Sequence, residues 1–169
     1  MLKTLFIALL LCIGAAAQAQ DAPTWQKEDG LYTLTAVVPV TGATKQALYD
    51  RARRWAALNY VSSKAVLELA DAESGTVIGK GILPYVRQSD VGKFENVAYT
   101  FVIDVKDGKY RLKATSFEIN GESIAASTAV ESVAVDRVKA RYLASIEQNI
   151  RSTEASLRKA MNTDPRAGF

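Results

Sequence analysis

The sequence predicts an α+β fold in which a curved antiparallel sheet carries two helices packed on one face. Three observations predict it. Apolar residues alternate with polar ones over residues 31–40 and repeatedly between residues 64 and 119, which is the period of strands. They recur at helical spacing over residues 45–60 and 128–161. Short glycine-containing turns separate successive strands, which favours antiparallel neighbours and gives the order β-α-β-β-β-β-α.

The first twenty residues have the form of a secretory signal peptide. The sequence MLK gives a positive start, residues 5–13 form an uninterrupted apolar run, and the Ala-Gln-Ala of residues 17–19 is a small-x-small cleavage site. The run is too short to cross a bilayer, which takes about 20 apolar residues. A lipidated cysteine requires a small residue just before it, whereas Cys12 follows three leucines, so we do not expect a lipoprotein. We therefore expect cleavage near residue 19 or 20 and export to the periplasm or beyond.

The mature chain is expected to form a single domain. About 150 residues are enough to bury one core, and no later segment is apolar enough to span a membrane. We assign residues 1–20 to the signal peptide, residues 21–162 to the domain and residues 163–169 to a disordered tail.

The composition excludes several classes of function. The chain has 21 basic and 18 acidic residues, and removal of Lys3 leaves a net charge of about +2. This balance and the predicted export argue against nucleic acid as a partner. The mature chain has no histidine and loses its one cysteine, which excludes disulfides, thiol nucleophiles, histidine-based triads and His/Cys zinc sites. We predict no catalytic residue, metal or cofactor; carboxylate catalysis by Glu68, Asp71 and Glu73 is the least favoured hypothesis.

The first strand and helix follow from residues 25–60. Asp29-Gly30 precedes the strand over residues 31–40, so Trp25 is expected on a short strand that pairs back onto it. Thr44 is the expected N-cap of the helix. Its buried stripe comprises Leu48, Ala52, Trp55 and Leu58. Beside this stripe lie Asp50, Arg53 and Arg54, for which a solvated face is favoured over an anion site.

The next hairpin contains a pair of glycines with two interpretations. Gly75 suits a left-handed turn position, and Asp71 is expected to organise that turn through the backbone. Gly79 and Gly81 share one strand face, which therefore carries no side chain at either position. The favoured interpretation is room for the Trp55 ring or a helix backbone. The alternative is an open groove beside Lys80, whose side chain points to the other face.

The central hairpin closes at Asp107-Gly108, which predicts a type I′ turn with positive φ at both positions. Lys106 then pairs with Lys109, and Asp104 with Arg111 as a cross-strand ion pair. The buried face would comprise Val97, Tyr99, Phe101, Ile103, Val105, Tyr110, Leu112 and Ala114. The basic residues are expected mostly to occupy the solvent face, and a binding patch around them is the alternative.

The last helix is expected to begin in a capping box at residues 128–131, with Ser132 as a competing start. Some 30 residues span roughly 45 Å, whereas the strands are near 33 Å long, so part of the helix should overhang the sheet. Beyond Ile150 we expect a fraying end, with a docking surface as the alternative. The apolar stripe comprises Val135, Val138, Tyr142, Ile146, Ile150, Leu157 and Met161.

Three stretches resemble the secreted bacterial domain-of-unknown-function family 4468, which is described as having a TBP-like fold. They are "VPVTGATKQALYDRARRWAALNY", "DAESGTVIGKG" and "YTFVIDVKDGKYRLKAT". The resemblance covers residues 31–117 and implies the fold and a secreted setting, but no activity. It implies no DNA binding, because a fold does not fix a function. The residues that carry it are Leu48, Tyr49, Trp55, Asp71, Gly75, Gly79, Lys80, Gly81, Lys106, Gly108 and Arg111.

The leading hypothesis is a non-catalytic exported binding or protein-interaction domain in the cell envelope. Its partner would be an envelope protein or the cell-wall matrix, and the last helix could form an oligomer. The candidate binding residues are Trp55, Lys80, Arg111 and Tyr142. The alternative is a carrier that holds a small apolar ligand between the last helix and the sheet. That ligand would contact Tyr99, Phe101, Tyr110 and Tyr142.

Overall fold

A computed structural model describes residues 22–60, 67–87, 94–119, 121–124 and 133–163 of the chain. Six antiparallel strands form one sheet, and a seventh short strand, β7 (Glu122–Ser123), pairs with β6. The order across the sheet is β1 (Thr24–Glu28), β2 (Leu31–Pro39), β6 (Lys109–Ile119), β5 (Phe94–Lys106), β4 (Thr76–Arg87) and β3 (Leu67–Asp71).

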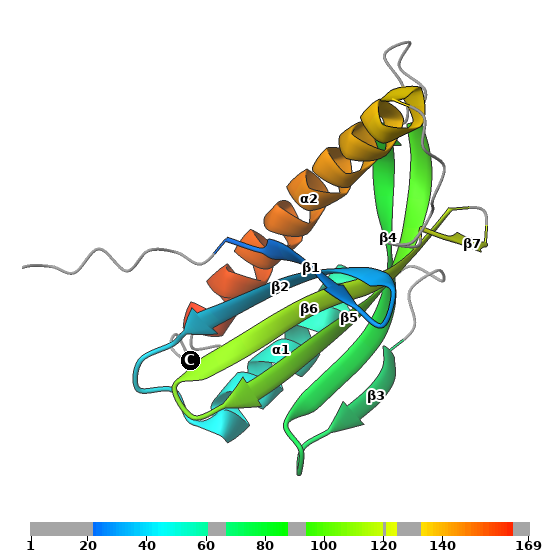
Figure 1. Ribbon diagram of the computed structural model, residues 1–169. Coiled ribbons are helices and arrows are strands. Elements are labelled where there is room, and N and C mark those ends of the chain that lie inside the picture. The colour runs from blue at the N-terminus through cyan, green and yellow to red at the C-terminus, as the bar shows by residue number, and fades with distance from the viewer. Residues whose placement is uncertain (1–21, 61–66, 88–93, 120, 125–132, 164–169) are drawn as a thin grey trace, which may run out of the picture.

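Both helices, α1 (Lys45–Asn59) and α2 (Val133–Asn162), lie on the same face of the sheet (Figure 1). The α+β class and the placement of both helices are as the sequence predicts. The strand pairing expected for Trp25 is confirmed by β1, whereas β7 was not predicted. The signal peptide, the capping box of residues 128–131 and residues 164–169 lie outside the described residues.

Aromatic rings fill the inner face of the sheet, which the helices cover. Tyr60 follows the last residue of α1, and its ring stacks on Phe101 with centroids 4.6 Å apart. Tyr99 stacks on Phe117 at 6.1 Å, and Phe117 meets the edge of Trp25 at 5.8 Å. Such offset and edge-on contacts stabilise beyond their buried area. The aromatic contacts therefore continue from α1 to the first strand.

The outer face of the sheet carries a polar ladder in the predicted register. Asp104 lies opposite Arg111, and Lys106 lies opposite Lys109. The inner-face residues predicted for this hairpin are all buried. An extra residue at Ser116, with φ of 52°, shifts the register before Phe117 and returns that ring to the inner face.

The predicted turn type at Asp107-Gly108 is wrong. Gly108 has φ of 73°, but Asp107 does not adopt positive φ. The reason is a tertiary contact: Asp107 Oδ1 accepts a hydrogen bond of 2.7 Å from the Lys45 backbone N–H at the start of α1. The turn with positive φ at both positions lies instead at Asp29-Gly30.

Three predictions about the helices are also wrong. Leu58 was placed on the buried stripe of α1, yet it is 67% exposed, whereas Trp55 on that stripe is buried. Beyond Ile150, α2 does not fray or leave the domain: Leu157 and Met161 are fully buried. The predicted overhang is not observed, because α2 crosses the sheet diagonally. Its N-terminal end lies beside the C-terminal end of β4 and the N-terminal end of β5 (Figure 1).

Candidate functional site

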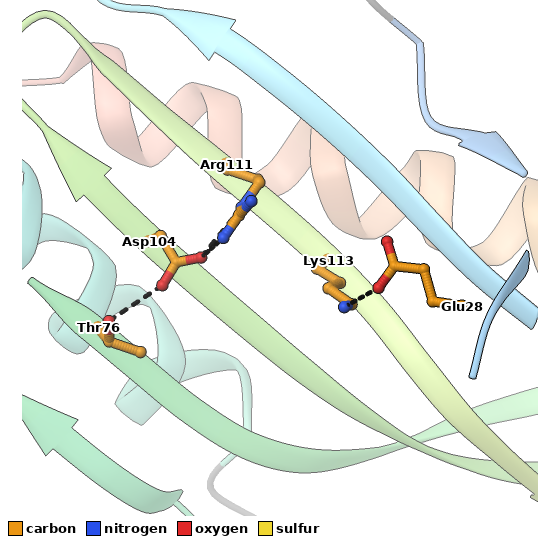
Figure 2. Close-up of polar contacts among 5 residues, drawn as sticks. All are labelled: Glu28, Thr76, Asp104, Arg111 and Lys113. Carbon is orange, nitrogen blue, oxygen red and sulfur yellow. Dashed lines mark hydrogen bonds and ion pairs between the residues drawn. The ribbon is translucent and has the colours of Figure 1, made fainter. Parts of the chain in front are cut away.

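Two of the predicted binding residues, Lys80 and Arg111, are neutralised on the outer face of the sheet. Arg111 donates to Asp104 Oδ2 from Nη2 at 2.6 Å and from Nε at 3.0 Å, and Asp104 also accepts from Thr76 (Figure 2). Lys80 pairs with Glu68 at 2.9 Å, and this contact raises the lysine pKa. Each of these two cations has a carboxylate partner, so this face does not present a free basic patch at these positions.

Tyr142, the third candidate, lies on α2 and donates to Glu95 Oε2 at 3.0 Å. Burial, followed by the nearby carboxylate, raises the pKa of its hydroxyl to about 12. A phenol held in its protonated form by these neighbours serves as a hydrogen-bond donor within the fold. It does not line the hollow described below.

The turn residues have structural roles. Asp71 accepts hydrogen bonds from the backbone N–H groups of Glu73 at 2.9 Å and Ser74 at 3.3 Å, as predicted. Hydrogen bonding by Ser74, and then by the Glu73 backbone, lowers the pKa of this exposed carboxyl group. Gly75 has φ of 77°, and a Cβ there would lie 2.9 Å from the Val105 carbonyl oxygen. No other residue fits this position without strain.

The glycine face of β4 is filled and forms no open groove at Gly81. A Cβ on Gly81 would lie 2.7 Å from a ring carbon of Tyr99 and 2.8 Å from one of Tyr60. The hydroxyl oxygens of these two tyrosines are 2.6 Å apart. Burial raises the pKa values of both hydroxyls, and the proximity of Tyr99 raises that of Tyr60 further. The favoured interpretation, room for the Trp55 ring or a helix backbone, is therefore wrong in the group it names: the close approach at Gly81 is made by the rings of Tyr99 and of Tyr60, which follows α1.

Trp55, the fourth candidate, belongs to a groove on the outside of the helical layer. This α1–α2 groove has a volume of about 360 Å³, and nine residues line it: Arg51, Arg54, Trp55, Leu58, Asn59, Ser156, Lys159, Ala160 and Thr163. A volume of this size is within the range of small-molecule pockets. Of the four predicted binding residues, only Trp55 lines it.

Helical spacing explains how the groove is built. Arg51, Trp55 and Asn59 follow one another at four-residue steps along α1 and face α2. Trp55 is buried, and its indole N–H donates to Ser156 Oγ at 3.0 Å. Because that polar atom already has a partner, the ring presents an apolar surface to the groove. Arg54 and Leu58, also four residues apart, form the exposed rim on α1.

The charges that line the groove are all positive. Arg51, Arg54 and Lys159 are among the lining residues, and no carboxylate is. Within the described residues, Arg54 and Lys159 have no ion-pair partner. Asp50, one turn before Arg54, accepts instead from Gln46 at 3.3 Å. These two exposed cations therefore differ from the paired cations of the outer sheet face.

Arg51 has a partly structural role. Its Nη1 donates to the carbonyl oxygen of Met161 at 2.6 Å, near the end of α2. The last carbonyls of a helix lack partners within the helix and carry partial negative charge, so a guanidinium stabilises them. This contact also joins the two helices at one end of the groove, and the Trp55–Ser156 hydrogen bond joins them nearer the other.

Sequence reasoning missed most of this site. Arg54 was considered as an anion site, but Leu58 was assigned to the core, and Lys159 was not singled out. The signal was present in α1, where Arg51, Arg54 and Leu58 lie within two turns. The residues that complete the groove come from α2, about a hundred positions later, and only the packing of the helices brings them together.

Two further hollows lie beside the domain. One, of about 570 Å³, is lined by Ala22, Pro23 and the side of α2 that holds Glu154 and Arg158. There Arg158 is paired, because its Nη2 lies 2.8 Å from Glu154 Oε1, and Arg151 is paired with Glu147. Lys159 lines this hollow as well as the α1–α2 groove. A smaller one, of about 220 Å³, lies at the tip of the central hairpin, where Asp104 and Arg111 neutralise each other. Lys106 and Lys109 also line it and have no ion-pair partner within the described residues, but no large exposed apolar side chain other than Val37 lies beside them.

Comparisons with known proteins agree with the geometry of the fold. Residues 34–120 match the family described as "Domain of unknown function (DUF4468) with TBP-like fold". The chain belongs to this family. A solved DUF4468 family protein from Bacteroides ovatus is 16% identical, with a TM-score of 0.64 over 84% of this chain and 93% of its own. A solved TBP-like protein from Parabacteroides distasonis is 14% identical, with a TM-score of 0.65 over 85% and 98%. No curated protein matches the sequence.

These likenesses show the fold and do not identify a ligand. Within the described ranges, no group of three or more His, Cys, Asp or Glu side chains could hold a metal ion. Neither α1 nor α2, the helices in the described part of the chain, is long and apolar enough to cross a membrane.

Proposed function

We propose that this member of the DUF4468 family is an exported, non-catalytic binding domain whose ligand site is the α1–α2 groove. The observation that carries the proposal is the groove itself. It has an apolar floor at Trp55 beside an exposed Leu58, and two of its cations, Arg54 and Lys159, have no ion-pair partner in the described part of the chain. Large exposed apolar side chains next to a hollow are typical of interaction sites. Export is supported by the signal-peptide pattern of residues 1–20.

The size of the groove favours a small ligand over a folded protein. A stable protein interface buries about 800 Å² per partner and involves about 20–30 residues on each side. Nine residues line the groove, and they span about two turns of each helix. A small molecule or the end of a flexible chain fits this space better than a second globular surface.

The contacts of the inner face favour this groove over the space between α2 and the sheet. Tyr99, Phe101 and Tyr110, which were expected to line an internal cavity, are buried. Tyr99 lies 6.4 Å from Phe101 between ring centroids, and Tyr110 donates to Glu154 at 3.2 Å. These side chains therefore have partners within the fold.

Binding of the neutral fluorescent probe N-phenyl-1-naphthylamine tests whether the groove is a ligand site. We expect saturable binding to the wild-type protein because Trp55 and Leu58 offer apolar surface. Ala160→Trp fills the groove and should abolish the signal. Ala144→Trp places the same ring on an exposed position of α2 outside the groove lining, and should leave binding unchanged.

Far-UV circular dichroism would establish that the variants fold. Should Ala160→Trp fail to fold, Leu58→Gln replaces a side chain that is 67% exposed and tests the same surface. Undiminished probe binding in a folded Ala160→Trp or Leu58→Gln protein would refute the groove as the site.

A further inference from the structure

We infer that the ligand of the α1–α2 groove is an amphiphile with one anionic headgroup, a carboxylate or phosphate, on an apolar chain. This inference rests on the proposed function, because it specifies the chemistry of the ligand at that site. Four features carry it: the sign of the lining charges, their lack of partners, their place along the groove and the character of its floor.

The charge of the lining selects an anion. Arg51, Arg54 and Lys159 contribute three positive charges, and no acidic side chain lines the groove to offset them. The C-terminal end of α2 lies nearby and carries about half a negative charge as the end of the helix dipole. Arg51 already donates to a carbonyl at that end. The two positive charges of Arg54 and Lys159 together exceed the partial negative charge at the end of α2. A net positive charge therefore remains to bind a headgroup.

The two helices run antiparallel along the groove, which gives it two different ends. At one end, Arg51 hydrogen-bonds to the Met161 carbonyl. Toward the other end, Ser156 hydrogen-bonds to both Trp55 and Asn59. The first end is cationic. At the second end, Ser156 Oγ accepts from the Trp55 indole and lies 3.5 Å from Asn59 Oδ1, so these polar atoms are engaged with one another.

The distance between the ends suits a chain of medium length. Eight residues separate Arg51 from Asn59, which corresponds to about 12 Å along the axis of α1. Between them lie Trp55 and Leu58, with Ala160 on the facing helix. A headgroup beside Arg54 and Lys159 would place its alkyl chain over the Trp55 ring and against Leu58. A purely polar anion would leave this apolar surface uncovered.

A titration followed by amide chemical shifts tests the inference with four probes of equal chain length. Decanoate and decyl phosphate are anionic, decanol is neutral and decyltrimethylammonium is cationic. We expect both anions to shift groove amides on α1 and α2 and to bind at least threefold more tightly than decanol. The cationic probe should bind most weakly. The ratio of the two anion affinities distinguishes a carboxylate ligand from a phosphate ligand.

Variants of the rim separate charge from apolar contact. Arg54→Gln combined with Lys159→Gln should weaken decanoate binding about threefold to tenfold, because exposed ionic contacts are individually weak. Arg53→Gln removes an exposed charge of α1 outside the groove lining and should have no effect. Added salt should weaken anion binding to the wild-type protein and have little effect on the double variant.

The outcomes distinguish the two proposals. Equal binding of decanol and decanoate at the groove would refute the anionic ligand while the groove remains a ligand site. The inference is also refuted if the anionic probes shift amides at the hairpin tip and not in the groove. It is refuted as well if the protein binds vesicles of anionic lipid but does not bind monomeric decanoate. If no probe shifts groove amides and N-phenyl-1-naphthylamine binding does not depend on Ala160, the proposed function itself fails.

Discussion

The outer face of the sheet and the α1–α2 groove carry the same kinds of basic side chain in different electrostatic settings. On the outer face, Arg111 pairs with Asp104 and Lys113 with Glu28 (Figure 2). Lys80 pairs with Glu68. In the groove, Arg54 and Lys159 have no such partner within the described residues. The number of cations on a surface therefore does not identify an anion site, because a paired cation offers a ligand no free charge.

The largest effect is expected where the carboxylate of an ion pair is buried. Glu154 is buried, and its Oε1 accepts from Arg158 Nε at 2.9 Å and from Tyr110 at 3.2 Å. Glu154→Ala should lower the free energy of unfolding by about 2–4 kcal/mol, because a partly buried guanidinium and a buried hydroxyl lose their acceptor. Urea denaturation measures this loss.

An exposed pair gives the matched control for that variant. Glu68→Ala removes the partner of Lys80 and should cost less than about 1 kcal/mol. Equal losses in the two variants would contradict the view that burial decides the value of a pair in this protein.

The next largest loss of stability is expected where a side chain is added to the filled inner face of the sheet. Gly81→Ala places a methyl group against the Tyr60 and Tyr99 rings and should destabilise the protein by about 1–3 kcal/mol. Thermal and urea unfolding would show the loss. Unchanged stability would mean that β4 has room at Gly81, and that a hollow exists on the inner face.

A smaller effect is expected when a pair on the outer face is opened. Asp104→Asn leaves Arg111 without its carboxylate and should lower the free energy of unfolding by about 1 kcal/mol or less. The variant should also gain weak, salt-sensitive decyl phosphate binding near Arg111, detected by amide shifts and lost when Arg111→Gln is added. Arg54→Gln should change stability by less than about 0.5 kcal/mol, because this cation has no ion-pair partner among the described residues. A larger loss would show that Arg54 is held within the fold.

The smallest effect concerns Asp71, whose charge is stabilised mainly by hydrogen bonds and not by a paired cation. Its folded-state pKa is lowered from the usual 3.8, so the unfolded chain takes up a proton more readily than the folded one. Its contribution is therefore present above about pH 4 and is lost as the pH falls below that value. Urea unfolding at pH 5 and pH 2 should show a slightly smaller decline for Asp71→Asn than for the wild type. An identical decline would argue against the turn contacts.

The sheet could be predicted closely from the sequence because its signals are local. Alternation fixes which side chains of β5 and β6 are buried, and a two-residue turn fixes the pairing of Asp104 with Arg111. The type of that turn could not be predicted, because the contact from Asp107 to Lys45 spans 62 positions and overrides the local preference of Asp-Gly.

The groove could be predicted only in part, because periodicity finds one apolar stripe and cannot tell what lies beside it. Leu58 fits the stripe of α1, but the position of α2 leaves it at the rim of the groove and 67% exposed. Likewise, Gly81 signals a close approach without specifying the ring that makes it. The relative placement of two helices distant in sequence is the information that these patterns lack.

The two Asp-Gly tips of the sheet also differ in how they can be engineered. At the central tip, Gly108 donates to Ala43 and accepts from Val40, and Asp107 accepts from the first residue of α1. A peptide inserted there would separate the hairpin from the start of that helix and cost stability. Within the described residues, Asp29 and Gly30 make no hydrogen bond to a helix or to the segment before one, so the first tip is the better place to attach a label or an affinity tag.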